Sequence, residues 1–419
     1  MARAPFARYR FHTFNTLNKD FVMTCRNTSH TSSPWLHRLT AHLRADLRAN
    51  VSTNLRAHLS AHALALGVIC ALALSVVTPT TSWAQTSPKL DKVVVAGWSK
   101  PITEITNLLV EEDKGFFKAR GIELGYVPGA GGGDALRNLL SGQADVAFTD
   151  PGSFFTALDK GEKLRAIYDI YPQNVFNVVS LKSQNILKPA DLKGKRIGVY
   201  SLASGTRQNL QVLLNQAGLT EADVTVVVTG LLNFAPLMQG QVDATAATDT
   251  GLLVGRQKGL GGVNVMEVKN HLNISSDFFV VREDTYQQKK DVLKRFLHAY
   301  QDSAKWMMQS PEEAAKLAVK VAIDGQNASM NLDIIRLRNE SSVSAITDQR
   351  GLGAFDMAGL QKGAHAYKAF GVIQHDLKVS DVVSQDLLPS QTQPAATSAN
   401  KAAKTQVTPQ NSAKAATSK

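Results

Sequence analysis

Two short polar segments in this sequence precede helix-like runs and carry most of its potential binding chemistry. The first is the glycine-rich stretch Gly129–Asp134, and the second is Ser201–Arg207, which reads SLASGTR. Glycines and hydroxyls before a helix leave backbone N–H groups free for an anion or a polar ring edge. The second segment adds a guanidinium, Arg207, for a negatively charged group. The alternatives are a flexible turn for the first segment and ordinary helix capping by Ser204 or Thr206 for the second.

A second pattern is a pair of matching phrases about a hundred residues apart. LLSGQADVAFTD spans residues 139–150, and LMQGQVDATAATD spans residues 237–249. Each passes from a helix-like run through a turn into a short strand and ends at Thr-Asp, as Thr149-Asp150 and Thr248-Asp249. Ligands of open α/β sheets bind at the carboxyl ends of strands, although helix capping is an equal alternative for each Asp. The repeat predicts two α/β lobes with a ligand cleft between them.

Aromatic and catalytic candidates are fewer. Trp98 follows the first expected strand, so we expect it and Ser99 in a loop where the indole ring contacts a ligand. After residue 84 the sequence has four histidines without metal-ligand spacing, no cysteine, no nucleophile elbow, no zinc-protease motif and no Walker loop. Asp134 stands where a dinucleotide fingerprint needs its third glycine. We therefore expect no catalytic residue, no cofactor and no metal.

The positive charge of the chain is concentrated at its two ends. Residues 1–84 hold nine Lys or Arg and two Asp or Glu, and the tail after residue 390 holds four Lys and no acid. These two ends account for the whole formal net charge of +11, because residues 85–390 hold 33 basic and 33 acidic residues. A nucleic-acid-binding domain concentrates basic residues on its folded part. We therefore expect no nucleic-acid partner.

The N-terminal region has the features of a secretory signal peptide. Ala63–Val77 is a fifteen-residue apolar run behind basic residues, and Ser82-Trp83-Ala84 resembles a cleavage site. A membrane anchor is the alternative, but spanning a bilayer takes about 20 apolar residues. We expect cleavage near Ala84, export to the periplasm, and loss of both cysteines, Cys25 and Cys70. The polar tail is expected to be disordered.

The rest of the chain alternates short β-branched runs with helix-like runs, which favours a parallel sheet in each lobe. Expected strands cover residues 92–97, 121–126, 146–149, 175–181, 196–200, 224–228, 244–248 and 277–282. Expected helices cover residues 102–117, 134–140 with Asp134 as cap, 151–158, 207–216, 233–238 and 292–308, and another begins at Pro311.

From Lys92 to about Leu388 the chain resembles the periplasmic substrate-binding proteins of bacterial ABC importers, in the nitrate/sulfonate/taurine and thiamine-pyrimidine-precursor (NMT1/THI5-like) group. The matching segments are residues 114–117, 121–123, 141–147, 191–199 and 240–244. The resemblance implies an α/β, type II periplasmic-binding-protein fold, two hinge crossovers and closure on a ligand. It also implies a non-enzymatic monomer that delivers a small molecule to a permease and ATPase of the inner membrane.

The expected organisation follows from the resemblance and the segments above. Residues 1–84 form the extension and signal peptide, 85–178 plus 278–388 the first lobe, 179–277 the second lobe, and 389–419 the tail. The expected ligand-binding residues are Trp98, Ser99, Gly131, Gly132, Gly133, Asp134, Thr149, Asp150, Ser201, Ser204, Gly205, Thr206, Arg207, Thr248 and Asp249.

The ligand class stays open between two alternatives. A sulfonate, carboxylate or related anion is the first expectation, and a neutral pyrimidine or thiamine precursor is the second. Sulfonate and taurine binders place a Trp after the second-lobe strand, where this chain has residues 247–251, ATDTG. A periplasmic enzyme and a sensor module that signals to a membrane receptor are the rivals from other classes.

Overall fold

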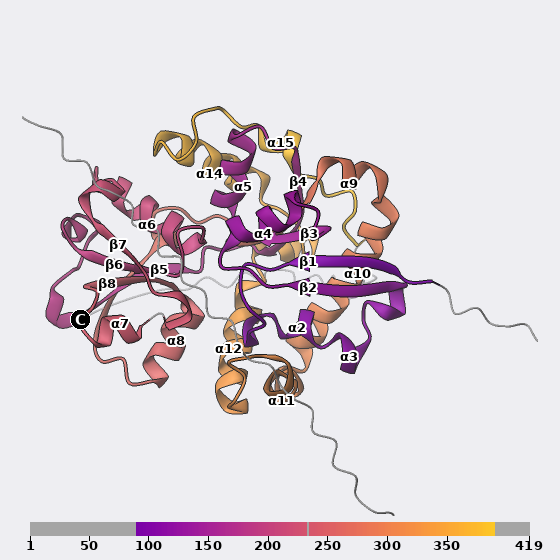
Figure 1. Ribbon diagram of the computed structural model, residues 1–419, viewed down its shortest axis with the longest axis horizontal. Coiled ribbons are helices and arrows are strands. Elements are labelled where there is room, and N and C mark those ends of the chain that lie inside the picture. Colours follow the sequence, from indigo (N-terminus) through magenta and orange to yellow (C-terminus); the bar gives the residue numbers. More distant parts are fainter. Residues whose placement is uncertain (1–88, 233, 390–419) are drawn as a thin grey trace, which may run out of the picture. The chain divides into compact units, whose positions relative to one another are not determined.

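Two mixed sheets form the framework of the described chain, which comprises residues 89–389 without 233 in this computed structural model (Figure 1). The first sheet has five strands in the order β2-β1-β3-β10-β4, and the second has five in the order β7-β6-β8-β5-β9. The strands of the first are β1 (Asp91–Ala96), β2 (Ile122–Val127), β3 (Val146–Thr149), β4 (Leu164–Tyr171) and β10 (Asp277–Arg282). Those of the second are β5 (Phe176–Leu181), β6 (Arg196–Val199), β7 (Thr225–Val228), β8 (Ala244–Thr248) and β9 (Val263–Glu267).

The expectation of a parallel sheet in each lobe is wrong for the fourth strand of each sheet, which is β10 in the first and β5 in the second. β1 pairs parallel with β2 and β3, and β6 pairs parallel with β7 and β8. However, β10 runs antiparallel to β3 and β4, and β5 runs antiparallel to β8 and β9. The reason is that β5 and β10 each enter directly from the other sheet, without the crossover helix that a parallel neighbour requires.

The two segments that cross between the sheets lie side by side and are hydrogen-bonded to each other. They are residues 172–175, before β5, and 271–276, before β10. Asn174 donates its backbone N–H to the side chain of Asn273 over 2.9 Å, and Val175 donates its own to the Ser276 hydroxyl over 2.9 Å. These bonds form the hinge of the two-lobed fold. The lobe boundaries stay a prediction, and β5 already belongs to the second sheet at Phe176.

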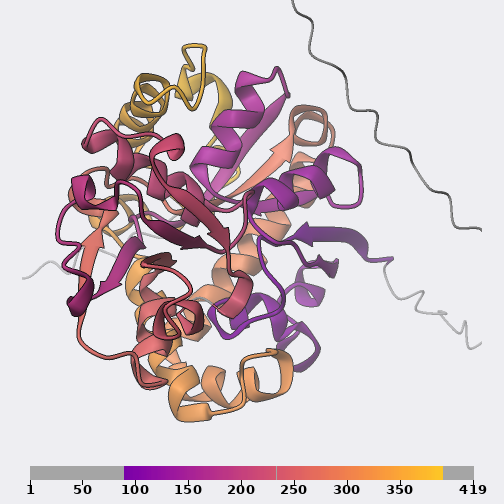
Figure 2. The same cartoon turned by 60° about the vertical axis from the view of Figure 1, so that its left-hand side comes forward.

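Helices cover the faces of both sheets (Figure 2). In Figure 1, α6, α7 and α8 stand with the second sheet and the remaining labelled helices with the first. The helices with the second sheet are α6 (Gly205–Gln216), α7 (Ala235–Met238) and α8 (Asp249–Gln257). Those with the first are α2 (Thr106–Leu109), α3 (Glu111–Lys114), α4 (Gly132–Leu140), α5 (Pro151–Asp159), α9 (Glu283–Gln288), α10 (Lys290–Gln309), α11 (Pro311–Val321), α12 (Ala328–Ser341), α13 (Ala345–Arg350), α14 (Met357–Ala369) and α15 (Val379–Val382).

The expected helix over residues 102–117 is wrong as a single element. The segment divides into a 3₁₀ turn, η1 (Thr103–Ile105), followed by α2 and α3, and it ends where Gly115 adopts a φ of 66°. Glu111 accepts the backbone N–H groups of Phe117 and Lys118 after that turn. Because most of η1 and α2 is buried, tertiary packing overrides the helical periodicity of the apolar residues here.

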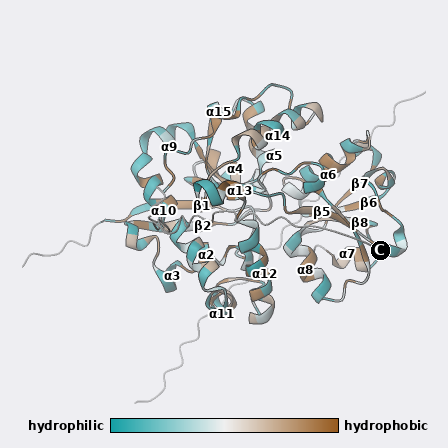
Figure 3. Cartoon of the chain, turned by 180° about the vertical axis from the view of Figure 1, so that it is seen from behind, coloured by the Kyte–Doolittle hydropathy of each residue, from teal (hydrophilic) through white to brown (hydrophobic). Residues whose placement is uncertain are grey.

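Both faces of the first sheet are buried, so its strands are apolar on both sides. Along β10, Phe278 packs in the cluster that contains α4 and α5 residues, whereas Phe279 packs in the cluster that contains α10 residues. Figure 3 shows hydrophobic residues on the strands and hydrophilic residues on the outer turns of the helices. Among the described residues, no helix is long and apolar enough to cross a membrane. The expected signal peptide, both cysteines and the residues from 390 onward lie outside the described part.

Replacing Phe279 by Ala should lower the free energy of unfolding by about 3–5 kcal/mol, because a fully buried ring is lost from the core. Its ring centroid lies 4.7 Å from that of Tyr300 and 5.3 Å from that of Phe296. Urea denaturation measures the change. Leu187→Ala is the control, since this side chain is 62% exposed and its loss should change the free energy by less than about 0.5 kcal/mol. Equal effects of the two substitutions would contradict the assigned core.

Candidate ligand-binding cleft

A cavity of about 160 Å³ lies between the two sheets, at the edge where the crossovers enter them. Corresponding strands of the two sheets supply its walls. Trp98 follows β1 as Tyr200 follows β6, Asp150 follows β3 as Thr248 ends β8, and Asp277 begins β10 as Phe176 begins β5. The repeat seen in the sequence therefore reappears as two facing sets of side chains.

Eight of the expected binding residues line this cavity, and seven do not. Those that line it are Trp98, Gly131, Gly132, Asp150, Ser204, Gly205, Thr206 and Thr248. The seven beside or away from it are Ser99, Gly133, Asp134, Thr149, Ser201, Arg207 and Asp249. The glycine-rich segment and the SLASGTR segment thus meet at one cavity, although they lie on different sheets.

Most of the seven are occupied by bonds within the protein. Arg207 is ion-paired with Glu221 at 2.6 Å, so the guanidinium expected for an anion is already neutralised. Thr149 donates its hydroxyl to the carbonyl of Gly132 over 3.0 Å. Asp134 is ion-paired with Arg137 and accepts the N–H of Ala130. It lies in the first turn of α4 and not at its cap, because that helix already begins at Gly132.

The first rim of the cavity is a close contact between backbones of the two lobes. Gly133 donates its N–H to the carbonyl of Ala203 over 3.0 Å, and the Ser201 hydroxyl bonds the carbonyl of Ala130. Gly131 adopts a φ of 124°, and a Cβ there would overlap the Ala203 carbonyl oxygen. Only glycine allows the lobes to approach this closely at that point.

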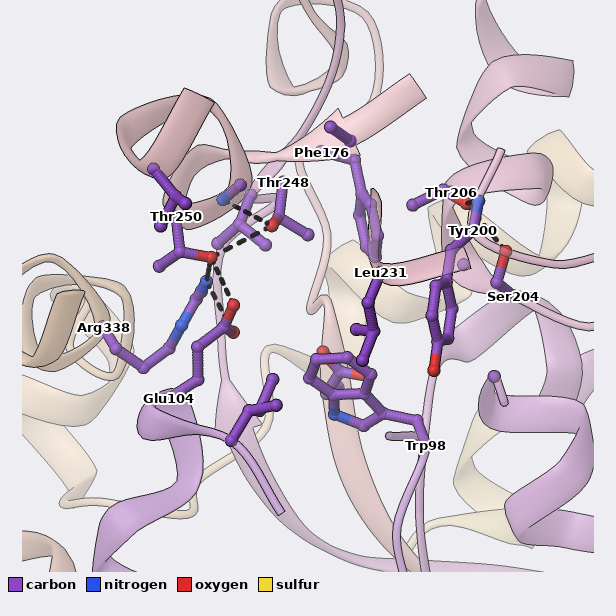
Figure 4. Close-up of a pocket in the computed structure, with 18 of the residues that line it drawn as sticks. Trp98, Glu104, Phe176, Tyr200, Ser204, Thr206, Leu231, Thr248, Thr250 and Arg338 are labelled. Carbon is purple, nitrogen blue, oxygen red and sulfur yellow. Dashed lines mark hydrogen bonds and ion pairs between the residues drawn. The ribbon is translucent and has the colours of Figure 1, made fainter. Parts of the chain in front are cut away.

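The second rim is a buried cluster of charged and polar side chains from both lobes (Figure 4). Arg338 of α12 pairs with Glu104 of η1 at 3.0 Å and with Asp249 of α8 at 2.8 Å. Thr250 bonds the Glu104 carboxylate and accepts from Arg338 over 2.9 Å. Arg338 is only 1% exposed and lies over the ring of Tyr171, 4.8 Å from its centroid. The cluster links residues of the two lobes.

Opposing effects set the ionisation of this second rim. Burial raises the pKa of Glu104, while Arg338 and the bond from Thr250 act in the other direction. Burial alone would lower the pKa of Arg338, but Asp249 and Glu104 raise it overall, so the guanidinium stays charged. Two of its nitrogens, Nε and Nη1, have no hydrogen-bond partner among the described residues.

Two carboxyl groups at the first sheet are not paired with a cation among the described residues. Asp150 is 2% exposed and accepts the N–H and hydroxyl of Ser153, each over 2.9 Å. Burial raises its pKa to about 6, and these bonds limit the rise. Asp277 is 7% exposed, and burial followed by the charge of Asp150 raises its pKa well above the ordinary value.

Sequence reasoning placed Asp150 in the cavity but missed Glu104, Asp277 and Arg338. Glu104 and Arg338 became neighbours only through tertiary packing, and the helix that carries Arg338 was not expected. Asp277 had a usable signal, since it begins an expected strand that returns to the first lobe. Tyr200 likewise ends the strand before the SLASGTR segment.

Replacing Arg338 by Met should lower the free energy of unfolding by about 3–5 kcal/mol, because Glu104 and Asp249 would then be buried without a cation. Urea denaturation of the ligand-free protein measures it. Lys258→Met is the matched control, since Lys258 lines the cavity but is exposed. The double variant Glu104→Gln/Arg338→Met should recover part of the loss. A change below about 1 kcal/mol in the single variant would argue against a buried ion pair.

A pH dependence follows from Asp150, which Asp277 and Tyr367 also face. Its folded pKa, about 6, exceeds the ordinary 3.8, so its stabilising contribution is full below pH 4 and is lost as the pH rises through 6. Relative to Asp150→Asn, the wild type should lose about 2–2.5 kcal/mol of unfolding free energy between pH 4 and 7. Urea denaturation at each pH measures this difference. If the free energy of unfolding changed equally with pH in both proteins, the raised pKa of Asp150 would be wrong.

Comparisons with known proteins agree with this geometry. The family model described as NMT1/THI5 like matches residues 102–314. The relatives that are similar in sequence include the following two proteins. The riboflavin-binding protein RibY of Chloroflexus aurantiacus is 23% identical over 342 residues, which are 78% of this chain and 97% of RibY. A 4-amino-5-hydroxymethyl-2-methylpyrimidine phosphate synthase of Legionella pneumophila is 24% identical over 227 residues, 51% of this chain and 68% of that protein.

Solved structures share the fold at low sequence identity. The alkanesulfonate-binding protein SsuA of Xanthomonas axonopodis, bound to MOPS, is 16% identical with a TM-score of 0.57 over 71% of this chain and 99% of its own. The periplasmic aliphatic sulphonate binding protein SsuA of Escherichia coli is 18% identical with a TM-score of 0.54 over 72% and 99%. With the family match over half of the sequence, these findings show that the chain belongs to the NMT1/THI5-like family and has the periplasmic-binding-protein fold.

Proposed function

We propose that this protein is the solute-binding component of an ABC import system. It captures one small organic solute between its lobes in the periplasm, acts as a monomer, and delivers the solute to a permease and ATPase of the inner membrane. The observation that carries the proposal is the cavity at the strand ends, which both lobes line and two interlobe rims enclose. Closure expels water and strengthens the polar contacts inside.

The size of the cavity favours a ligand with a single ring. A cavity of about 150 Å³ is known to hold benzene, and this one measures about 160 Å³. The riboflavin named for RibY has three fused rings, which exceed this space in the closed conformation. Phe176 and Tyr200 from the second sheet and Trp98 from the first supply flat walls for one ring (Figure 4).

The charges of the cavity favour an uncharged or cationic solute over an anion. The only cationic side chain in the segment expected to hold a sulfonate or carboxylate is Arg207, and it is ion-paired with Glu221 outside the cavity lining. Arg338 is matched by two carboxylates, and Lys258 is exposed. Glu104, Asp150 and Asp277 all line the cavity. The pyrimidine-type alternative therefore ranks above the sulfonates bound by the SsuA proteins.

A periplasmic enzyme on the same fold is the second candidate, and the synthase name of the Legionella relative is what favours it. Against it stands the composition of the cavity, whose lining contains no His or Cys among the described residues. Its hydroxyl groups are also engaged. The hydroxyl oxygens of Ser204 and Thr206 are hydrogen-bonded to each other over 2.7 Å, and the Thr206 hydroxyl accepts the backbone N–H of Tyr200 over 3.0 Å. We therefore assign these side chains to binding.

Native mass spectrometry of residues 85–390, purified without denaturation, should show a monomer carrying one small co-purified molecule. That molecule should leave chemically unchanged on denaturation. Trp306→Phe provides a second readout, because it leaves Trp98 as the single tryptophan of this segment. Adding the recovered molecule back to unloaded protein should change the Trp98 fluorescence, since its indole lines the cavity.

Chemical conversion of the recovered molecule during incubation would favour the enzyme. Return of the molecule without any change in Trp98 fluorescence, or binding that survives Trp98→Ala undiminished, would place the solute outside this cavity. The matched control is Trp306→Ala, because Trp306 packs on Phe116 and does not line the cavity. It should leave affinity unchanged.

A further inference from the structure

The two Thr-Asp pairs of the sequence repeat lie in different surroundings. Asp150, after β3, lines the cavity, whereas Asp249, at the start of α8, does not. The Asp249 carboxylate instead reaches the other lobe, where it accepts hydrogen bonds from Arg338 over 2.8 Å and from the Ser341 hydroxyl over 3.2 Å. Because both donors belong to α12, Asp249 makes a contact between the lobes at the position where its counterpart lines the cavity.

α12 is anchored to the first lobe by its own contacts. The side-chain amide of Asn331 donates to a carbonyl of α11 over 3.1 Å, and that of Asn339 donates to a carbonyl of α10 over 3.0 Å. Ile335 is fully buried in a cluster with residues of α10 and α11. When the second lobe moves away from the first, α12 therefore stays behind, and the bonds that Asp249 accepts from it must break.

Glu104 differs from Asp249 because it lies in the same lobe as Arg338 (Figure 4). Its carboxylate pairs with Arg338 at 3.0 Å, and movement of the second lobe does not separate this pair. A buried guanidinium without a counter-ion is costly, and Glu104 avoids that cost when the lobes are apart. Asp249 supplies the part of the ion-pair cluster that depends on closure, together with the Thr250 hydroxyl, which accepts from Arg338 over 2.9 Å.

Burial distinguishes this interlobe contact from a surface ion pair. The side chain of Arg338 is 1% exposed and that of Asp249 is 27% exposed. Exposed ion pairs contribute little to stability, whereas hydrogen bonds to charged groups that are shielded from water contribute more. Asp249 and Glu104 both raise the pKa of Arg338, so its charge persists over the physiological pH range. All of these contacts join groups of the chain itself.

We propose that Asp249 and Arg338 form an interlobe latch, which joins the two lobes in part of the molecules even without the solute. Asp249 is a positioning residue, because it acts through Arg338 and does not line the cavity. The bonds at the first rim join neutral groups, such as the N–H of Gly133 and the carbonyl of Ala203, and such bonds are weaker than charge-assisted ones. The latch goes beyond the proposed function, because it regulates closure whatever solute the cleft holds.

Pulsed electron double resonance between two spin labels measures whether the lobes are joined. The labels are attached by Arg256→Cys on α8 and Lys316→Cys on α11, at two exposed positions. α12 contacts both of these helices, so the label distance increases when the second rim separates. The full chain is used with Cys25→Ser and Cys70→Ser, because it has no other cysteine. Unfolding in urea, dialysis and refolding give unloaded protein.

The unloaded protein should give two distances, a short one for joined lobes and a longer one for separated lobes. Asp249→Asn keeps the shape of the side chain but loses its charge, so the ratio of the short to the long population should fall at least about tenfold. Glu267→Gln is the matched control, because it removes a carboxylate whose partner, Lys269, belongs to the same lobe. It should change the ratio less than about twofold.

Two results would overturn the latch. One is the long distance alone in the unloaded wild-type protein, and the other is an unaltered ratio in Asp249→Asn. If that variant does not fold, Thr250→Val gives the decision, since it removes the second-lobe hydroxyl that bonds Glu104 and Arg338. The ratio should then fall at least about threefold, and an unchanged ratio would again reject the latch.

Failure of the latch is distinguishable from failure of the proposed function. A short distance that appears only after the co-purified molecule is added back would reject the latch and keep solute binding. A short-distance population that depends on Asp249, in a protein whose native mass spectrum shows no co-purified molecule, would support the latch and argue against solute binding.

Discussion

The candidate cleft depends on the hydrogen-bonded pairing of the two crossover segments. Because residues 172–175 and 271–276 bond to each other, the sheets are joined along one line and the cleft can open only on the far side of it. Val175, Phe176 and Asp277 lie on or directly after these segments and line the cavity. The hydrogen-bonded crossover segments therefore also contribute to the lining of the cavity.

The second rim and the strand ends that carry Asp150 and Asp277 differ in how their charged groups are paired. At the second rim the charge of Arg338 is matched by carboxylates from both lobes, so closure there completes an ion-pair cluster without the ligand. At the strand ends of the first sheet, neither Asp150 nor Asp277 forms an ion pair with a described residue, although the charge of Arg338 acts on Asp277. Under the proposed function, a solute would be favoured if it provided partners for the unsatisfied buried groups of the cavity.

The sequence allowed the two-sheet plan to be predicted, because the repeated phrase at residues 139–150 and 237–249 marks equivalent strand ends. It also allowed the polar helix starts around Gly131 and Ser204 to be located. Local spacing could not reveal which charges neutralise each other. Glu221 lies fourteen residues beyond Arg207 and removes it from the site, and Arg338 reaches Glu104 only through the packing of α12. The antiparallel strands β5 and β10 were misjudged for a similar reason, since strand direction depends on where the preceding segment came from.

The order of the strands has a consequence for how the chain folds. All strands of the second sheet come from one uninterrupted stretch, residues 176–267, whereas the first sheet needs β10 from residues 277–282 between β3 and β4. Because β10 lies between β3 and β4 in the sheet, these two strands are not paired with each other. The first sheet therefore cannot be completed before residues 277–282 are available. The strands of the second sheet are closer together in sequence, and such contacts form faster than distant ones. Synthesis from the N-terminus thus begins the first lobe early and completes it last.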